Sequence, residues 1–325
     1  MKDRVRGRWI AIFATGLLIV ATAVLVVGTA GASTKAKCGT VTLNEQAWAG
    51  STANTYVAKA ALEKHLGCKV NITQIAEIPV YQALANGKTD AVLEDWQHVD
   101  QYKQYVTKQK TAVLGSPNGV VGHIGWFIPT YLMKQHPEFK TWKGLKGKET
   151  LFKSPESGSQ GMFLGGDPSY VQKDQQLIKA LGLNFKFVSV GAEPAQVARW
   201  SQLYKQHKPV IFYWYTPQYL NQEFQLSEVA LPKRFKGCLD DAKTAGADVS
   251  KYKCAYDKTI IEKVFSKKFA NSNSAAYKAL AKFSWSNADQ ELVAKWIAGD
   301  HMKPDKAGQK WVSENAAKVN AWFGK

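Results

Sequence analysis

The chain has 325 residues, of which 45% are hydrophobic and 21% charged, a composition typical of one large or two ordinary globular domains and not of extended disorder. Lys and Arg number 43 against 26 Asp and Glu, which gives a formal net charge of +17. The basic residues form only short clusters and no nucleic-acid-binding motif is present, so we interpret the charge as a solvated cationic surface and expect no nucleic-acid partner.

The first 32 residues have the organisation of a secretory signal peptide. A basic segment precedes an uncharged apolar stretch at residues 10–27, and Ala-Gly-Ala at residues 30–32 resembles a cleavage site. The apolar stretch is long enough that an uncleaved membrane anchor is the alternative. Cys38 follows Lys-Ala-Lys, which is not the context of a lipid-acceptor cysteine, so we see no lipobox. We therefore expect an exported protein at the periplasmic or extracellular face of the cytoplasmic membrane.

The chain contains four cysteines, and an even number in an exported protein indicates two disulfides. Four cysteines allow three pairings, of which we expect the sequence-local one, Cys38–Cys68 with Cys238–Cys254. A zinc site is the alternative, but there is no C-x-x-C motif and no nearby histidine pair. We therefore expect no metal and no cofactor.

Hydrophobic periodicity predicts alternating strands and helices. The first strands are expected at residues 39–45, 69–75 and 91–93, with a helix that ends at Gly67 and a second helix at residues 80–86 between them. Further strands are expected at residues 120–129, 147–155, 185–190 and 209–217, helices at residues 171–181 and 192–206, and a helical region at residues 275–325. Strands joined by helical crossovers indicate an α/β fold with parallel sheets.

The strand at residues 209–217 ends in three consecutive aromatic residues, Tyr213, Trp214 and Tyr215. One face of a strand cannot bury all three, because successive side chains point to opposite sides. In open α/β sheets the ligand crevice lies beyond the carboxyl ends of the strands. We therefore predict that Trp214 lies at the mouth of a ligand site.

Three other tryptophans occupy comparable positions: Trp48 after the first strand, Trp96 after the third, and Trp126 within the strand at residues 120–129. Packing explains any one of these tryptophans, since indoles are buried on average. Four of them at strands and strand ends suit a pocket for a bulky, weakly hydrated cation. A quaternary ammonium group presents diffuse positive charge and methyl surface, and the faces of indole rings attract both.

Short motifs in a fixed order carry a resemblance over residues 39–232. They are AWAG at 47–50, LGCKV at 66–70, GKTDA at 87–91, EDW at 94–96, GWFIP at 125–129, SGSQG at 157–161 and YWYTP at 213–217. In this order they resemble the substrate-binding proteins of ABC importers for glycine betaine, choline and related quaternary ammonium compounds.

The resemblance implies a two-lobed, periplasmic-binding-protein-like α/β fold, with a central β-sheet in each lobe and a ligand cleft between the lobes. Lobe I would contain residues 38–125 and 233–325, and lobe II residues 126–232. An aromatic cage would consist of Trp48, Trp96, Trp126 and Trp214, with Tyr170, Tyr213 and Tyr215 as candidates of second rank. The turn Ser157, Gly158, Ser159 and Gln160 would bind a carboxylate through backbone N–H groups, or would be an ordinary surface loop.

The implied function is capture of a quaternary ammonium compatible solute for osmoprotection and its delivery to a membrane-embedded ABC permease by a monomeric, non-enzymatic binding protein. Choline-binding members carry an acidic residue shortly after the first tryptophan, where this chain has Ala49 and Gly50, so we expect a zwitterion such as glycine betaine. The alternatives are an exported hydrolase and a cell-surface adhesin with an exposed aromatic face. The turn at residues 157–161 lacks the first glycine of a nucleophile elbow, which argues against the hydrolase.

Overall fold

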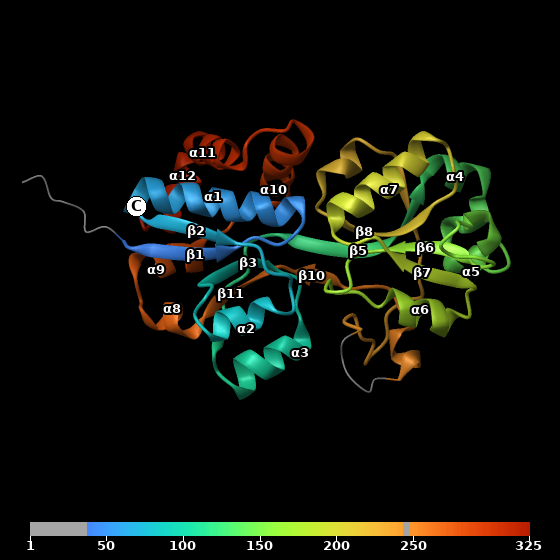
Figure 1. Ribbon diagram of the computed structural model, residues 1–325, viewed down its shortest axis with the longest axis horizontal. Helices are drawn as coiled ribbons and strands as arrows, with labels where there is room; N and C mark the ends of the chain where they lie inside the picture. Colours follow the sequence, from blue (N-terminus) through green and yellow to red (C-terminus); the bar gives the residue numbers. More distant parts are fainter. Residues whose placement is uncertain (1–37, 243–247) are drawn as a thin grey trace, which may run out of the picture. The chain divides into compact units, whose positions relative to one another are not determined.

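The computed structural model describes residues 38–242 and 248–325, which fold into two mixed β-sheets with helices packed around them (Figure 1). The predicted signal peptide at residues 1–32 lies outside the described residues. In the part of the chain that is described, none of the helices combines the length and the apolar character that crossing a bilayer requires.

The first sheet has the strand order β2-β1-β3-β11-β4. Its strands are β1 (Thr40–Asn44), β2 (Lys69–Thr73), β3 (Ala91–Asp95), β4 (Ala112–Leu114) and β11 (Glu262–Ser266). β1, β2 and β3 are parallel, and the helices α1 (Ala49–Leu66) and α2 (Val80–Ala85) connect them, which confirms the predicted strand–helix–strand pattern. β11 pairs antiparallel with β3 and β4, so a segment from late in the chain completes this sheet.

The second sheet has the order β10-β5-β8-β6-β7, and β9 pairs with β5 outside this path. Its strands are β5 (Val121–Pro129), β6 (Gly161–Gly165), β7 (Phe185–Ser189), β8 (Ile211–Thr216), β9 (Leu226–Val229) and β10 (Lys258–Ile260). β6 runs parallel to β7 and β8, whereas β5 runs antiparallel to β8, β9 and β10. The helices α6 (Asp174–Leu181) and α7 (Glu193–Lys205) occupy two of the predicted helical regions.

One predicted strand is wrong. Residues 147–155 form a 3-10 helix, Glu149–Phe152, because only one turn there has a buried apolar side chain: Phe152 packs on Phe139 and Phe185, whereas Leu151 is exposed. The strand instead follows at Gly161–Gly165, where Met162, Phe163 and Leu164 are buried. This strand is difficult to predict from the sequence, because glycines flank it and a Ser/Gly-rich turn precedes it.

Residues 275–325 are helical, as predicted, and several of these helices pack on α1. The region contains α9 (Ala275–Lys282), α10 (Asn287–Ala294), a π-helical turn (Lys295–Gly299), α11 (Pro304–Glu314) and α12 (Ala316–Trp322). The short helices elsewhere are α3 (Val99–Gln101), α4 (Thr130–Gln135), α5 (Trp142–Leu145) and α8 (Lys267–Asn271). The shorter turns are a π-helical turn at Tyr102–Lys108 and 3-10 turns at Pro137–Lys140, Tyr219–Gln222 and Val249–Tyr252. Trp285, Trp311 and Trp322 pack against one another there and account for three tryptophans as core.

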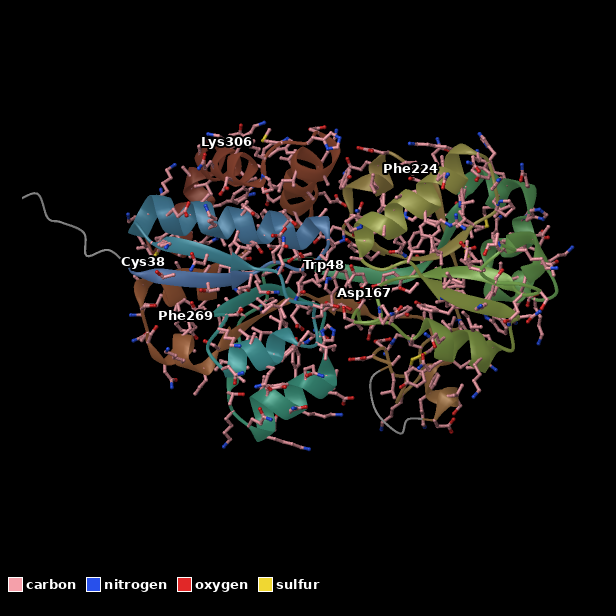
Figure 2. All side chains as sticks on the ribbon, in the orientation of Figure 1. Cys38, Trp48, Asp167, Phe224, Phe269 and Lys306 are labelled. Carbon is pink, nitrogen blue, oxygen red and sulfur yellow. A yellow bond between two sulfur atoms is a disulfide. The ribbon has the colours of Figure 1, made fainter. Side chains whose placement is uncertain are left out.

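The structure has the sequence-local disulfides. Cys38, labelled in Figure 2, pairs with Cys68 and ties the start of β1 to the start of β2. Cys238 pairs with Cys254, and the 3-10 helix between them, Val249–Tyr252, contacts α6 beside the second sheet. The division into lobe I (residues 38–125 and 233–325) and lobe II (residues 126–232) remains a proposal. That division assigns β10 and the first residues of β5 to lobe I, whereas both strands pair within the second sheet.

Candidate ligand-binding site

A small aromatic cavity lies where segments that follow strands of the first sheet meet strands and loops of the second. Its free volume is about 20 Å³, which is room for about one water molecule. Its lining consists of Trp48, Glu77, Trp96, Tyr170, Val171, Tyr213 and Tyr215. We call the five aromatic residues of this lining the aromatic box.

The chain topology explains why these side chains converge. Trp48 lies between β1 and α1, and Trp96 directly follows β3, so both lie beyond the carboxyl ends of parallel strands. Tyr170 lies in the loop between β6 and α6. Tyr213 and Tyr215 are two positions apart on β8 and therefore point to the same side of the sheet.

The rings of the box meet mostly edge to face. The centroids of Trp48 and Tyr170 are 5.5 Å apart with an interplanar angle of 84°, and those of Trp96 and Tyr215 are 5.4 Å apart at 82°. Tyr213 lies 6.4 Å from Tyr170. Rings at right angles form adjoining walls of a cavity, and this is an arrangement in which several ring faces can surround one cation.

Glu94, at the buried end of β3, binds both indoles of the box. Its Oε1 accepts hydrogen bonds from Trp48 Nε1 at 2.8 Å and Trp96 Nε1 at 3.1 Å, and its Oε2 accepts one from Asn54 Nδ2 at 2.6 Å. Burial raises the pKa of the Glu94 carboxyl to about 7, although the two indole N–H groups oppose the shift. A carboxylate that accepts a hydrogen bond from an indole N–H makes the indole ring more electron-rich. The box therefore attracts a cation more strongly when Glu94 is ionised.

Glu193, in the first turn of α7, connects the tyrosine side of the box to the start of α1. Its carboxyl accepts hydrogen bonds from the Tyr215 hydroxyl, from the backbone N–H of Ala49 at 3.0 Å and from Gln218 Nε2 at 3.3 Å. Burial raises the pKa of Glu193. These hydrogen bonds hold segments of the first and second sheets together around the box.

Glu77, the charged residue that lines the box, forms part of a buried charge cluster. The Nε2 atom of His98 lies 3.5 Å from Glu77 Oε2, and its Nδ1 atom lies 3.6 Å from Asp95 Oδ2. Burial lowers the pKa of His98, but the facing carboxylates outweigh burial and raise it well above its usual value. When it is protonated, His98 offsets one of the two negative charges of the carboxylates that face it.

The structure does not bring Trp126 and Trp214 to this cavity. Trp126 is fully buried, packs on Phe163 with ring centroids 4.7 Å apart, and donates a hydrogen bond to Asp174 at 2.6 Å. Trp214 is also fully buried and packs against Trp200 at 5.2 Å. Strand alternation explains the second case, because Trp214 points to the side of β8 opposite to its two tyrosine neighbours.

The turn at residues 157–160 also lies apart from the box. It precedes the amino end of β6, whereas Tyr170 lies in the loop after the carboxyl end of the same strand. A five-residue strand spans about 16 Å, so the two ends of β6 are far apart on the scale of a small ligand. Ser157 is buried and its hydroxyl donates to the backbone carbonyl of Gln160 at 2.8 Å, which stabilises the turn itself.

The sequence analysis missed the three carboxylates around the box. Glu94 leaves a signal, because a glutamate at the end of a buried apolar strand needs hydrogen-bond partners. No sequence pattern identifies Glu77, because it lies in a short loop between β2 and α2. Glu193 resembles any acidic residue in the first turn of a helix, here α7.

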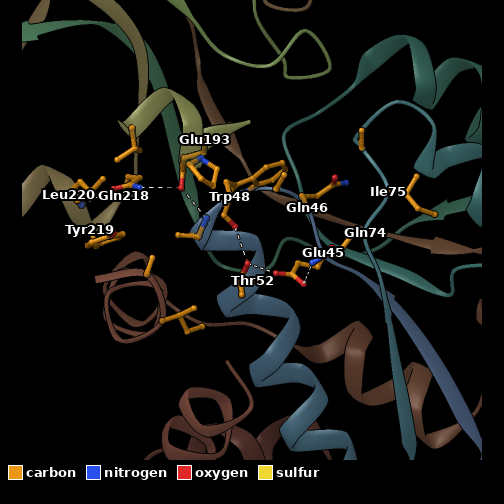
Figure 3. A pocket seen from close by; sticks show the side chains of 17 residues that line it. Glu45, Gln46, Trp48, Thr52, Gln74, Ile75, Glu193, Gln218, Tyr219 and Leu220 are labelled. Atoms are coloured by element: carbon orange, nitrogen blue, oxygen red, sulfur yellow. Dashed lines mark hydrogen bonds between the residues drawn. The ribbon is translucent and has the colours of Figure 1, made fainter. Parts of the chain in front are cut away.

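A second, larger cavity adjoins the box and shares Trp48 with it (Figure 3). Its free volume is about 550 Å³. Its polar lining consists of Glu45, Gln46, Thr52, Gln74, Glu193, Gln218 and Tyr219. Glu193 lines this cavity and accepts the hydrogen bond from Gln218 that Figure 3 draws as a dashed line. This cavity therefore adjoins the box at Trp48, and most of its lining surface is apolar.

Two mixed α/β sheets with a small aromatic site between their strand ends define the class of two-lobed solute-binding proteins. Residues 39–314 match the family described as the substrate-binding domain of the ABC-type glycine betaine transport system. The chain belongs to this family, whose members are solute-binding components of transporters and not enzymes. Membership confirms the resemblance seen in the sequence.

Solved structures have the same fold at low sequence identity. Lactococcal OpuAC in its closed conformation with glycine betaine is 21% identical, with a TM-score of 0.68 over 88% of this chain and 99% of that one. The glycine betaine/L-proline-binding protein ProX from Borrelia burgdorferi is 19% identical, with a TM-score of 0.69 over 87% and 96%. A choline-binding protein in complex with choline is 18% identical, with a TM-score of 0.68 over 88% and 92%.

Proposed function

We propose that this protein captures a quaternary ammonium compound in the aromatic box and delivers it to the membrane permease of an ABC importer. The observation that carries the proposal is the convergence of five aromatic side chains on one small cavity, with buried carboxylates behind them. Family membership supports the transport role, and the ligands in the structures of similar proteins, glycine betaine and choline, support the class of compound.

The chemistry of the box suits a trimethylammonium group better than a primary amine. A quaternary nitrogen has no N–H to donate, so it gains little from hydrogen-bond acceptors and much from ring faces and apolar contact. Each desolvated cation–π contact contributes about 2 kcal/mol, and micromolar affinity corresponds to about 8 kcal/mol. Three such contacts contribute about 6 kcal/mol, so burial of the methyl groups has to supply the remainder and offset the entropic cost of association.

The proposed box differs from the four tryptophans of the sequence analysis. Trp48 and Trp96 stay in it, and the three tyrosines take the places of Trp126 and Trp214, which lie in the core. We further propose that the protein is monomeric, is exported through its N-terminal segment and acts at the periplasmic or extracellular face of the cytoplasmic membrane.

The proposal is tested by isothermal titration calorimetry with a methylation series, in which ethanolamine is compared with its mono-, di- and trimethylated forms, and glycine with glycine betaine. We expect micromolar affinity for a fully methylated member and a loss of affinity with each methyl group removed. Equal affinity for ethanolamine and choline, and for glycine and glycine betaine, would contradict the box. Absence of binding throughout would favour the adhesin or hydrolase alternatives.

Transport is tested separately by uptake of a radiolabelled ligand that calorimetry has identified. Cells that lack this protein should lose the high-affinity uptake, and expression of the wild-type chain should restore it. Restoration by a variant that does not bind the ligand would contradict delivery to the permease.

A further inference from the structure

The charged residues that line the two cavities are all acidic. Glu77 lines the aromatic box, and Glu45 and Glu193 line the adjoining cavity, whereas none of the described residues that line either cavity is Lys, Arg or His. The chain as a whole contains 43 Lys and Arg against 26 Asp and Glu. The linings of these two cavities are therefore acidic in a strongly basic protein, whereas a third cavity, which shares Trp96 and Val171 with the box, also contains Lys103 and Lys258.

The groups behind the box add negative charge. One imidazole, His98, faces two carboxylates, Glu77 and Asp95, so even a protonated His98 offsets only one of their two negative charges. Glu94 accepts the indole N–H groups and Glu193 accepts the Tyr215 hydroxyl. Ionisation of either makes the potential inside the box more negative, which favours a ligand with net positive charge.

Four of the five aromatic residues of the box donate their polar hydrogen to a protein acceptor; the Tyr213 hydroxyl is the exception among the described residues. Trp48 and Trp96 donate their N–H groups to Glu94, and Tyr215 donates its hydroxyl to Glu193. The Tyr170 hydroxyl donates to the backbone carbonyl of Ala47 at 3.2 Å. A ligand carboxylate in the box would therefore lose its hydration without gaining these donors, and it would face Glu77.

We infer that the site selects quaternary ammonium compounds that carry net positive charge and no carboxylate, and that Glu77 is the residue that determines this specificity. The inference rests on the proposed function and deepens it. It reverses the preference for a zwitterion in the sequence analysis, which depended on the absence of an acidic residue directly after Trp48. In the fold, the loop before α2 supplies that acid from elsewhere in the chain.

The carboxylate of Glu77 also limits the shape of the ligand. A hydroxyl group on a short arm of the ammonium can donate a hydrogen bond to Glu77, whereas a carboxylate on the same arm is repelled by it. The class of ligand is therefore a small hydroxyalkyl or alkyl trimethylammonium cation.

The first test uses the unaltered protein and three probes at physiological salt: choline, tetramethylammonium and glycine betaine. Titration calorimetry should show that choline binds at least tenfold more tightly than glycine betaine. Tetramethylammonium should also bind more tightly than glycine betaine. Glycine betaine binding as tightly as choline, or more tightly, would overturn the inference and leave the proposed function intact. Binding of none of the three would refute the proposed function itself.

The second test removes the charge of Glu77. In Glu77→Gln the preference for choline over glycine betaine should fall at least tenfold, whereas Glu77→Asp should retain most of it. Glu45→Gln is the matched control, since Glu45 lines only the adjoining cavity, and it should change the preference less than threefold. An unchanged preference in a folded Glu77→Gln protein, or an equal change in Glu45→Gln, overturns the role of Glu77. If Glu77→Gln does not fold, the ranking in the unaltered protein still decides the inference.

Discussion

Trp96 offers the sharpest test of the aromatic box, because it can be compared with a tryptophan that the sequence ranked equally. Trp96 lines the cavity, packs edge to face on Tyr215 and donates its N–H to Glu94. Trp214 stands next to Tyr215 in the chain but is buried on the other side of β8. We therefore consider the pair Trp96→Ala and Trp214→Ala.

The expected loss for Trp96→Ala follows from its contacts. Loss of one desolvated cation–π contact costs about 2 kcal/mol, which is a roughly 30-fold increase in Kd. Glu94 keeps the N–H groups of Trp48 and Asn54, so the substitution does not leave its carboxyl without donors. Trp214→Ala instead removes a fully buried ring, which typically costs about 3–5 kcal/mol of unfolding free energy.

The assay combines calorimetric titration with chemical denaturation on both variants. Trp96→Ala should raise Kd at least tenfold, and Trp214→Ala should lower the unfolding free energy while its folded fraction binds within about threefold of the unaltered protein. Unchanged affinity in Trp96→Ala would refute the box. If folded Trp214→Ala lost as much affinity as Trp96→Ala, the ligand would not bind in the aromatic box.

Two other substitutions test the surroundings of the box, and a third tests a buried lysine on β11. A Cβ on Gly122 would lie 2.4 Å from the Trp96 ring, so Gly122→Ala should displace the indole and weaken binding at least fivefold in calorimetry; unaltered affinity would contradict this close approach. Because the pKa of Glu94 is about 7 and a bound cation favours its ionised form, Kd should fall as pH rises from 6 to 8, and Glu94→Gln should abolish that slope. Burial lowers the pKa of Lys263 to about 7 from its ordinary 10.5, so the unfolded state binds more protons between these values and the unfolding free energy should rise with pH in this window. Urea denaturation at pH 7 and 9.5 should show a smaller rise in Lys263→Met, and an equal rise would contradict the shift.

Much of the fold could be predicted because local patterns determine it. Alternation and helical periodicity placed β1, α1, β2 and α2, and the sequence-local pairing of cysteines agrees with the structure. β11 could not be predicted in its place, because its pairing with β3 joins residues more than 160 positions apart and depends on the tertiary fold. The strand Gly161–Gly165 was hidden by its glycines, which are unfavourable in strands on local propensity.

The site was predictable to the extent that strand ends determine it. Trp48 and Trp96 follow parallel strands, and this position alone places them at the crevice. β8 contains four consecutive aromatic residues at 212–215, and only the orientation of the strand in the sheet decides whether Trp214 or its two tyrosine neighbours face the cavity. Glu77 could not be found from sequence, since its approach to the box depends on how a short loop packs.

The most direct test of the aromatic box is a crystal structure of the protein with a bound quaternary ammonium ligand. We expect the quaternary nitrogen to lie within about 6 Å of the ring centroids of Trp48, Trp96 and Tyr215, the range of a cation–π contact. A ligand bound in the adjoining cavity, with its nitrogen beside Glu45 and Gln74 and the box empty, would contradict the account.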